Sequence, residues 1–399
     1  MQKPIDVIII GGGAAGLMAA IWALRKKEKV LVLESKNECA KKILISGGGR
    51  CNILPSIANL DYFYSESKSH SVKKVFKTWP LEQIQMFFEY ELNLPLKVEA
   101  DTGKLYPSSD KSRDVRNALV REVKNLGGDI RHECKVESLA KKETLFNVLH
   151  TQGEHQAPKV ILATGGLSVP QTGSEGAGYK FAKTFGHSCL QTYPALVPLL
   201  SDDQDFKDLS GLSHYVSWKA KIKGKVVDSG ERNILFTHKG FSGPAILDAS
   251  HWVIYKKADL ILNFCNTSKE DLKKDFISTP SQNISKWMRQ YMPNRLAKCL
   301  LKKAVIPHDV RLGNINKESR GKILEAICNY KIDITGSRGF QVAEVTGGGI
   351  PLAEINLNTF ESKKIEGLYL CGELLDIFGR IGGHNFYWAF VSGKLAGEH

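Results

Sequence analysis

The chain has 399 residues, 42% apolar side chains and a formal net charge of +13 at pH 7. This length predicts two or three domains, and the composition supports a sizeable core. No apolar run approaches the roughly 20 residues of a membrane-spanning helix, and the first run, Val7 to Ile10, ends at glycines. We therefore expect neither a membrane protein nor a secretory signal. The positive charge is typical of a protein with a polyanionic partner, and equally of one with a solvated, lysine-rich surface.

Eight cysteines are scattered along the chain, at positions 39, 51, 134, 189, 265, 299, 328 and 371. No two of them form a C-x-x-C motif, so the sequence predicts neither a zinc site nor a thioredoxin-like disulfide, and no metal site. Unpaired cysteines are typical of reduced thiols in a cytoplasmic protein, which is the location that we expect. Apart from Cys51, we assign these cysteines no chemistry.

The first motif is a strand, a glycine-rich turn, a helix and a second strand. In chain order these are Val7–Ile10, the G-x-G-x-x-G glycines Gly11, Gly13 and Gly16, a helical repeat over Leu17–Leu24, the strand Val30–Leu33, and Glu34. Such glycines allow a tight turn, backbone approach to a pyrophosphate and close helix–strand packing. The free N–H groups at the helix start hold phosphates, and Glu34 can accept hydrogen bonds from a ribose. The pattern predicts dinucleotide binding; the alternative is an ordinary glycine-rich turn.

A second glycine cluster follows in Lys41–Asn52, which reads KKILISGGGRCN. Three consecutive glycines beside Ser46, Arg50 and Cys51 can bring the backbone close to a ligand, and the alternative is a plain loop. Farther on, we expect helices over 71–91 and 112–126. We expect strands in four places: Leu94–Tyr106 (a pair), Ile130–Leu139, Leu145–Leu149 and Lys159–Leu162.

From about Thr192 the pattern changes to short β-rich runs, which suggest a small antiparallel barrel or sandwich. These runs are Leu196–Leu200, Tyr215–Ile222, Lys225–Asp228, Ile234–Thr237 and Leu260–Phe264. Residues 268–330 are helical and polar, Phe340–Thr346 and Gly367–Cys371 predict strands, and Asn385–Leu395 predicts a helix. This order indicates an insertion within a nucleotide-binding domain. We expect an α/β fold with that domain in 1–191 and 347–399, a β-rich subdomain in 192–267 and 331–346, and a helical subdomain in 268–330.

Two later motifs indicate a flavin. Ala163-Thr164-Gly165 resembles the second fingerprint of two-dinucleotide-fold flavoproteins, and GLYLCGELLD, from Gly367 to Asp376, resembles their third. In such proteins the acid at Glu373 lies near the ribityl chain. The helix after Gly382-Gly383 would aim its positive end at the flavin. No second G-x-G-x-x-G follows a strand and opens a helix, so a separate nicotinamide-binding domain is not expected.

Seven segments in one order resemble the YhiN/BaiN/RdsA family of FAD-dependent oxidoreductases, from Ile5 to Gly397. They are GGGAAGLMAA, KKILISGGGRCN, ILATGGLSVPQTG, PALVPL, LFTHKGFSGPAIL, AEVTGGGI and GLYLCGELLDIFGRIGGHNFYWAFVSGKLAG. The resemblance implies a Rossmann-like domain that binds FAD, with an inserted β-barrel and a small helical subdomain. Family members reduce carbon–carbon double bonds. One branch acts on bile acid enones and another makes dihydrouridine in large-subunit ribosomal RNA.

From the motifs and the resemblance we predict a set of cofactor-binding residues. They are Gly11, Gly13, Ala14, Ala15, Gly16, Glu34, Ser35, Lys42, Gly48, Gly49, Arg50, Cys51, Asn52, Val136, Ala163, Thr164, Gly165, Gly372, Glu373, Asp376, Gly382, Gly383 and Asn385. Arg50 can pair with a pyrophosphate or a substrate carbonyl, or form a structural ion pair. Lys42 can reach a phosphate or ribose, or be solvated.

The chemistry needs a hydride from the flavin, supplied to it by NAD(P)H, and a proton from an acid. Cys51 is one candidate acid, and its alternative is a buried packing role. His384 stands where the family commonly has Tyr in GGYN, and is either a proton donor or a hydrogen-bonded structural residue. His238 either faces the substrate or is structural.

Positive charge is concentrated in two stretches that also contain aromatic residues. Ser268–Glu325 has 13 Lys or Arg against 6 Asp or Glu, and Lys41–Lys77 has 7 against 2. Basic residues interleaved with aromatic ones favour nucleic acid, and the alternative is a solvated face. Three readings therefore stay open: a reductase of uridine in ribosomal RNA, a reductase of a small apolar enone, and a non-enzymatic flavoprotein that binds RNA or a partner.

Overall fold

The computed structural model describes residues 4–67 and 69–399, which form two compact units. Unit 1 comprises the described residues up to Pro194 and Glu344–His399, and unit 2 comprises Ala195–Ala343. Each unit has its own hydrophobic core. Unit 2 is therefore an insertion into unit 1, as the order of the predicted elements indicates.

A five-stranded sheet is the centre of unit 1. Its order is β21-β11-β1-β2-β7, and all four pairings are parallel. The strands are β1 (Val7–Ile10), β2 (Val30–Leu33), β7 (Asp129–Arg131), β11 (Lys159–Leu162) and β21 (Leu368–Leu370). Every residue of β1 and β2 is buried, as expected of a parallel sheet whose two faces are both covered by other elements.

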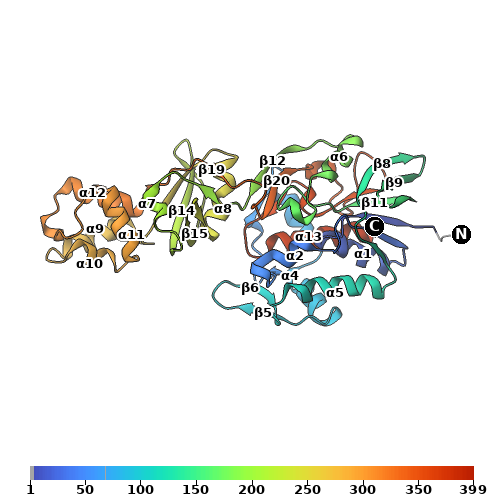
Figure 1. Cartoon of the computed structure of the whole chain (residues 1–399), viewed down its shortest axis with the longest axis horizontal. Coiled ribbons are helices and arrows are strands. Elements are labelled where there is room, and N and C mark those ends of the chain that lie inside the picture. Colours follow the sequence, from blue (N-terminus) through green and yellow to red (C-terminus); the bar gives the residue numbers. More distant parts are fainter. Residues whose placement is uncertain (1–3, 68) are drawn as a thin grey trace. The chain divides into compact units, whose positions relative to one another are not determined.

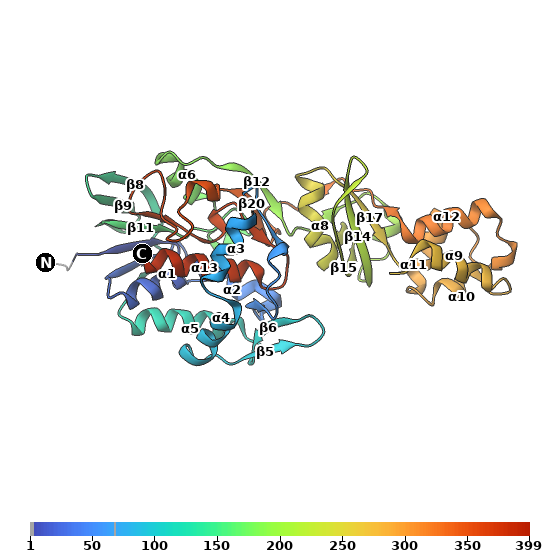
Figure 2. The same cartoon turned by 180° about the vertical axis from the view of Figure 1, so that it is seen from behind.

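Helices α1 (Ala14–Arg25) and α13 (His384–Glu398) lie side by side on this sheet in both views (Figures 1 and 2). A Cβ atom on Gly393 would lie 2.3 Å from the carbonyl oxygen of Ala15, and one on Gly397 would lie 2.2 Å from that of Ala19. These glycines let the two helix backbones touch. The first and last helices of the chain are thereby packed into one layer.

The other elements of unit 1 surround this core. The helices are α2 (Lys41–Ile45), α3 (Ser69–Lys77), α4 (Leu81–Met86), α5 (Ser112–Asn125) and α6 (Ala177–Thr184). The smaller sheets are β10-β9-β8, β3-β6-β5, β12-β20 and β22-β4. Their strands are β3 (Leu54–Pro55), β4 (Phe63–Tyr64), β5 (Leu96–Glu99), β6 (Lys104–Pro107), β8 (Val136–Lys142), β9 (Leu145–His150), β10 (Gly153–Ala157), β12 (Leu190–Ala195), β20 (Val345–Gly349) and β22 (Phe378–Gly379).

Unit 2 is built on a seven-stranded antiparallel sheet with a group of helices. The sheet order is β18-β17-β14-β15-β16-β13-β19, so β18 and β19 are its edges. The strands are β13 (Leu199–Leu200), β14 (Ser213–Ile222), β15 (Lys225–Thr237), β16 (Gly240–Ser242), β17 (Asp259–Asn263), β18 (Tyr330–Lys331) and β19 (Gly336–Ser337). The helices are α7 (Gln204–Lys207), α8 (Pro244–Ile254), α9 (Lys269–Ser278), α10 (Ile284–Met288), α11 (Asn294–Lys303) and α12 (Lys317–Cys328). Within this unit, α9 to α12 gather at one end (Figure 1).

Most predicted elements are confirmed, and the differences have local causes. The helix predicted over 71–91 is interrupted between α3 and α4, where Pro80 precedes the second helix. The strand predicted over Ile130–Leu139 is two strands, β7 and β8, because Glu133 between them has a left-handed backbone with φ of 55°. Phe340–Thr346 is wrong for its first five residues, since β20 starts at Val345.

In unit 2, the sequence pattern predicts two short strands where the structure has one, and it predicts another strand that is too long. Lys225–Asp228 and Ile234–Thr237 are the two ends of one strand, β15, which stays paired to β14 through Ser229–Glu231. The polar middle of this strand interrupts the apolar pattern although the backbone continues. Only Leu199 and Leu200 of the run Leu196–Leu200 form a strand.

Candidate cofactor site

Three predicted motifs meet at one edge of the parallel sheet. The last residues of β1, β2 and β11, namely Ile10, Leu33 and Leu162, are register partners, and Leu162 is also paired with Leu370 at the end of β21. Gly11, Glu34, Ala163 and Cys371 are the next residues of the four strands, so they lie along the same edge. The carboxyl edge of such a sheet is where nucleotides bind in doubly wound α/β folds.

The glycines of the first motif divide into two kinds. Gly11 has a φ of +105°, and a Cβ there would lie 2.5 Å from the carbonyl oxygen of Ala163. A Cβ on Gly16 would lie 1.9 Å from the carbonyl oxygen of Gly11. A Cβ on Gly13, in contrast, meets nothing within 4 Å. Gly11 and Gly16 are therefore required for packing, and Gly13 leaves open space at the start of α1.

The amino end of α1 suits an anion. Its N-cap residue, Gly13, makes no side-chain capping hydrogen bond, and the first turn contains Ala14 and Ala15 and no acidic residue. The first N–H groups of the helix therefore keep their hydrogen-bonding capacity for a phosphate, which the helix dipole also favours.

Glu34 is fixed beside this turn. The side chain is buried, and its Oε2 accepts a hydrogen bond of 2.8 Å from the backbone N–H of Gly12. Its Oε1 accepts bonds from the N–H of Lys36 at 2.9 Å and the hydroxyl of Ser35 at 3.3 Å. Val136, the buried first residue of β8, lies two residues after Cys134, whose N–H donates to the Glu34 carbonyl. The carboxylate is thus held where a ribose would be recognised.

Lys42 and Glu373 form a network that joins segments 331 residues apart. The Lys42 Nζ lies 2.6 Å from Oε2 of Glu373 and 2.7 Å from Oγ of Ser168. The Ser168 hydroxyl donates to Oε1 of Glu373 at 2.6 Å, and so does the N–H of Thr346 at 2.9 Å. A Cβ on Gly166 would lie 2.4 Å from Oγ1 of Thr346, so the neighbouring glycine permits this approach. The sequence pattern does not single out Ser168 or Thr346, although Ser168 lies two residues after Gly165-Gly166 and Thr346 directly precedes three glycines.

Asp376 joins the third motif to a different segment. Its carboxylate is buried, and Oδ2 accepts hydrogen bonds from the hydroxyl of Ser65 at 3.2 Å and the N–H of Glu66 at 2.9 Å. Gly372, four residues earlier, faces the first motif, since a Cβ there would lie 2.9 Å from Cβ of Ala15. Thr164 faces α6, where a Cβ on Gly178 would lie 2.0 Å from its Oγ1.

The turn before α13 is fastened to the second glycine cluster. Gly383 has a φ of +91°, and a Cβ there would lie 2.4 Å from the carbonyl carbon of Leu54. The Asn52 amide, in the orientation that satisfies both its groups, accepts from the Gly383 N–H at 3.0 Å. Asn385 bonds the N–H and the C=O of Gly379, both at 2.9 Å. The amino end of α13 is thereby fixed beside the cluster. Gly48 and Gly49 have open space above them, as does Gly13.

Cys51 and Arg50 occupy structural positions. Cys51 is fully buried, and burial raises the pKa of its thiol to about 12. Arg50 lies 2.9 Å from Glu99 and 2.8 Å from Asp110, and its guanidinium stacks 4.0 Å above the ring of Tyr106. These contacts correspond to the packing alternative for Cys51 and the ion-pair alternative for Arg50.

His384 lies within an aromatic group whose members come from distant parts of the sequence. Its ring is buried, and the rings of Tyr62 and Phe63 contact it edge-on at 5.5 and 5.6 Å between centroids. The guanidinium of Arg380 stacks 4.7 Å from the Tyr62 ring and donates to the hydroxyl of Tyr64 at 3.0 Å. The pairing of β4 with β22 brings these residues together although they lie more than 300 positions apart.

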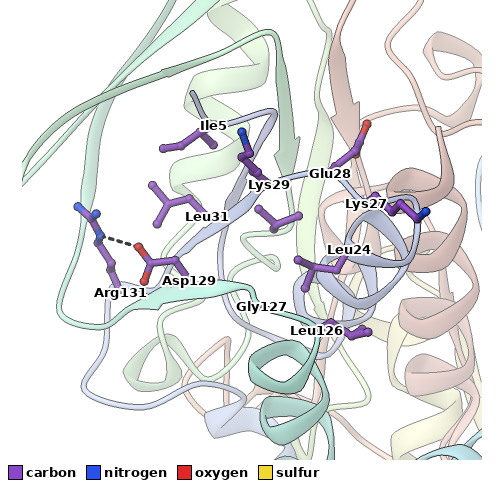
Figure 3. A pocket seen from close by; sticks show the side chains of 11 residues that line it. Ile5, Leu24, Lys27, Glu28, Lys29, Leu31, Leu126, Gly127, Asp129 and Arg131 are labelled. Atoms are coloured by element: carbon purple, nitrogen blue, oxygen red, sulfur yellow. Dashed lines mark hydrogen bonds and ion pairs between the residues drawn. The ribbon is translucent and has the colours of Figure 1, made fainter. Parts of the chain in front are cut away.

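A pocket of about 620 Å³ lies elsewhere in unit 1 (Figure 3). Its lining includes Ile5, Lys29 and Asp129, which precede or start β1, β2 and β7 at the amino edge of the sheet. The glycine motifs lie at the carboxyl edge. We therefore do not assign this pocket to the cofactor.

Many basic side chains already have acidic partners. Lys302 and Lys303 pair with Asp205 and Asp203, and Lys73 pairs with Asp61. Lys68 lies outside the described residues. Among the described basic residues of the predicted stretches, several are exposed and have no recorded ion pair; they are Lys74, Lys77, Lys273, Lys286, Arg289, Lys298, Arg311 and Lys317. Sequence charge alone therefore overstates the charge available to a partner.

The site residues fit FAD. Open space at Gly13, Gly48 and Gly49, the uncapped start of α1 and the fixed Glu34 carboxylate match a dinucleotide. Within the described residues, no group of three or more His, Cys, Asp or Glu side chains is placed to hold a metal ion. None of the helices in the described ranges is long and apolar enough to span a bilayer.

Residues 5–399 match the family described as HI0933-like protein Rossmann domain. The chain belongs to this family. It is 30% identical over 392 residues to a ribosomal RNA dihydrouridine synthase of Escherichia coli, covering 98% of this chain and 96% of the relative. It is also 30% identical over 405 residues to a 3-dehydro-bile acid delta(4,6)-reductase of Clostridium scindens, covering 98% and 97%.

The fold is shared with a solved ketosteroid dehydrogenase. The structure of 3-ketosteroid-delta4-(5alpha)-dehydrogenase from Rhodococcus jostii aligns with a TM-score of 0.53 at 12% identity, over 100% of this chain and 98% of that one. The family has a Rossmann-like, FAD-binding α/β fold, and its members are FAD-dependent oxidoreductases. The resemblance to the YhiN/BaiN/RdsA family is confirmed, and the chain is an FAD-dependent oxidoreductase.

Proposed function

We propose that this chain uses NAD(P)H to reduce a conjugated carbon–carbon double bond, and that the substrate is a uridine of large-subunit ribosomal RNA. The observation that carries this proposal is the full-length similarity to a ribosomal RNA dihydrouridine synthase. A second relative of that name, from Haemophilus influenzae, is 30% identical over 400 residues. The non-enzymatic reading is thereby set aside.

Each part of the carboxyl edge has a task in this proposal. The start of α1 holds the pyrophosphate, Glu34 holds the ribose of the adenosine part, and the Lys42–Glu373 network positions the ribityl part. FAD, when bound, supplies hydride transfer between NAD(P)H and the substrate double bond. The residues beside it have to exclude water, orient the substrate and deliver a proton.

The aromatic group beside α13 suits a planar substrate. Tyr62, Phe63 and Tyr64 are half-buried, so each ring keeps part of its surface accessible. Aromatic rings stack on unpaired bases, and a guanidinium such as that of Arg380 hydrogen-bonds to carbonyl oxygens. We infer that this group is the side of the site that receives the base.

The proton donor in this proposal is His384 rather than Cys51. A thiol whose pKa is raised to about 12 by full burial donates its proton poorly near neutral pH. His384 is the first residue of α13 and lies in the aromatic group. The family commonly has a tyrosine at this position. Tyrosine and histidine can both donate a proton.

The exposed basic residues of unit 2 supply RNA affinity. Lys286 and Arg289 lie on or just beyond α10, and Arg311 pairs in a backbone bridge with Asn283, at the start of the same helix. Together they make one positively charged surface, which we call the α10 surface. Such charges bind phosphates with little regard to sequence, whereas the aromatic group reads the base.

The deciding experiment is mass spectrometry of large-subunit ribosomal RNA from cells that lack this gene. We expect one dihydrouridine to become uridine, a loss of about 2 Da, and a plasmid copy to restore it. A Glu34→Arg copy is the matched control, because it removes ribose hydrogen bonds and should not restore the modification. An unchanged RNA would overturn the RNA substrate.

The second candidate is a reductase of a small apolar enone, favoured by the similarity to the bile acid reductase. Purified, FAD-loaded protein can be given NADH or NADPH with either a steroid enone or unmodified ribosomal RNA. Oxidation of the nicotinamide with the steroid alone would favour this candidate. Oxidation with the RNA alone would favour the first.

A further inference from the structure

Two cysteines that the sequence pattern does not pair are in contact in unit 2. The Sγ atoms of Cys265 and Cys328 lie 3.9 Å apart, although 62 residues separate them. Cys265 follows β17 and is half-buried, and Cys328 is the buried last residue of α12. The N–H of Phe264 donates to the carbonyl of Ile327 at 2.8 Å, so the two backbones are fastened beside the sulfur atoms.

The place of this pair in the chain is informative. Helix α9 begins at Lys269, four residues after Cys265, and α12 ends at Cys328. The two cysteines therefore flank the whole helical segment, α9 to α12, at its entry and its exit. A bond between them would close this segment into a loop.

We propose that Cys265 and Cys328 form a redox-active dithiol that a peroxide oxidises to a disulfide, clamping the helical segment at its base. This inference goes beyond the proposed function and does not depend on it. The half-exposed Cys265 is the thiol that a small oxidant can reach, and the buried Cys328 is the one that resolves the product. The geometry needs only that the two sulfur atoms approach from contact distance to bonding distance.

The local environment agrees with these roles. The hydrogen bond with Cys328 lowers the pKa of Cys265, while the same contact and burial hold the pKa of Cys328 above its ordinary value. A thiolate is the nucleophile toward peroxides, so Cys265 reacts first. In its protonated form the Cys265 thiol donates to Oδ1 of Asn263 at 3.1 Å, which holds the side chain in place before it reacts.

The chemistry balances in two steps. The Cys265 thiolate attacks one peroxide oxygen, the S–O bond forms, the O–O bond breaks and the first water leaves after protonation. Cys328 then attacks that sulfur, the S–S bond forms, the S–O bond breaks and the second water leaves. Two thiols lose two electrons in total, and one peroxide is reduced to two waters.

The first test uses the full, FAD-loaded chain and hydrogen peroxide. After a few equivalents we expect two fewer titratable thiols, a mass lower by about 2 Da, and a cross-linked peptide containing Cys265 and Cys328. In Cys328→Ser, a sulfenic acid on Cys265 should be captured by dimedone. Cys189→Ser is the matched control, because Cys189 is also half-buried and no described sulfur atom lies beside it. It should cross-link as the wild type does.

A second measurement tests the clamp and needs no variant. Closing a loop of this length raises the melting temperature of unit 2 by about 5–10 °C, and dithiothreitol should reverse the rise. Amide exchange in residues 268–327 should slow on oxidation. The proposal is overturned if all eight thiols survive peroxide, or if the disulfide maps to other cysteines. It is equally overturned if oxidation leaves both melting and exchange unchanged.

Discussion

Two ion pairs, one in each unit, place charged side chains in opposite surroundings. In unit 1, Lys42 and Glu373 are about 25% and 17% exposed and form a network with the buried Ser168 hydroxyl and the Thr346 N–H at the glycine motifs. In unit 2, Lys302 is 72% exposed and pairs with Asp205 on the surface. A charged group that is removed from water needs hydrogen-bonding or ion-pair partners in the protein, whereas water solvates a charged group on the surface. The Lys42–Glu373 pair is therefore part of a site, whereas the Lys302–Asp205 pair lies on a surface.

The largest expected effect separates folding from binding within unit 1. Gly16→Ala would place a Cβ against the Gly11 carbonyl, and overpacking rigid backbone costs about 3 kcal/mol, so we expect a large fall in melting temperature. Gly13→Ala has room for its Cβ but fills the open space at the start of α1. We expect the melting temperature of Gly13→Ala to equal that of the wild-type protein without FAD, and we expect the variant to retain less FAD than the wild type. Equal melting of the two variants would contradict this division.

The next effect concerns the buried network. Lys42→Met leaves the Glu373 carboxylate with only Ser168 and Thr346, and we expect a loss of about 1–3 kcal/mol by chemical denaturation. The double variant Lys42→Met/Glu373→Gln should lose less than the two single variants added together, because neither charge is then left alone. Lys302→Met is the unit 2 control and should be close to the wild type. Additive losses would show that Lys42 and Glu373 are energetically independent.

A smaller effect should appear in RNA binding and not in stability. The charge of the sequence suggests a test in which Lys298, Lys302 and Lys303 are replaced by Glu. This change would break the ion pairs of Lys302 and Lys303 in α11, so stability and RNA binding would both change and could not be separated. We instead expect Lys286→Glu, Arg289→Glu and Arg311→Glu to weaken RNA binding while FAD content stays the same. Each lost phosphate contact should flatten the slope of log K against log salt by about 0.7–0.9.

The matched control reverses Lys26, Lys27 and Lys124, exposed residues of unit 1 at the carboxyl ends of α1 and α5. The change in net charge is the same, so a similar loss of RNA affinity would mean that only total charge matters. A loss confined to the first triple variant would locate binding on the α10 surface.

The smallest expected effect is at Cys51. A general acid contributes about 10²–10⁴-fold to a rate, whereas a packing residue contributes little. We expect Cys51→Ala to retain FAD and to change substrate turnover by less than about tenfold. His384→Asn should slow turnover of the substrate much more than reduction of the flavin by NAD(P)H. A large fall in Cys51→Ala would return the acid role to Cys51.

The parts of the fold that local sequence determines were predictable. Strands β1 and β2, helix α1 and the spacing to Glu34 follow from apolar runs, glycines and one acid within 28 residues. The partner of Lys42 was not predictable, because Glu373 is 331 positions away and only the parallel sheet brings it near. The aromatic group around His384 has the same origin in the pairing of β4 with β22.

Pairing of charges and thiols was equally hidden. Lys302 and Lys303 looked available because Asp205 and Asp203 lie about 100 residues earlier. The sequence assigns no chemistry to Cys265 and Cys328, since no two cysteines form a C-x-x-C motif, and their contact spans 63 positions. In each case the chain between the two partners folds back and brings them together, and no local sequence pattern indicates where that contact forms.

The contact between α1 and α13 has a consequence for synthesis. Every strand of unit 2 has been synthesised by the time Ala343 is made, before α13, so that unit can fold while translation continues. Unit 1 is different, because its first helix must wait until Gly393 and Gly397 arrive to pack on Ala15 and Ala19. The nascent glycine turn therefore stays without its covering helix through most of translation. FAD capture should be one of the last events in the maturation of this chain, and pulse-labelled nascent chains should acquire unit 2 protease resistance before they acquire flavin.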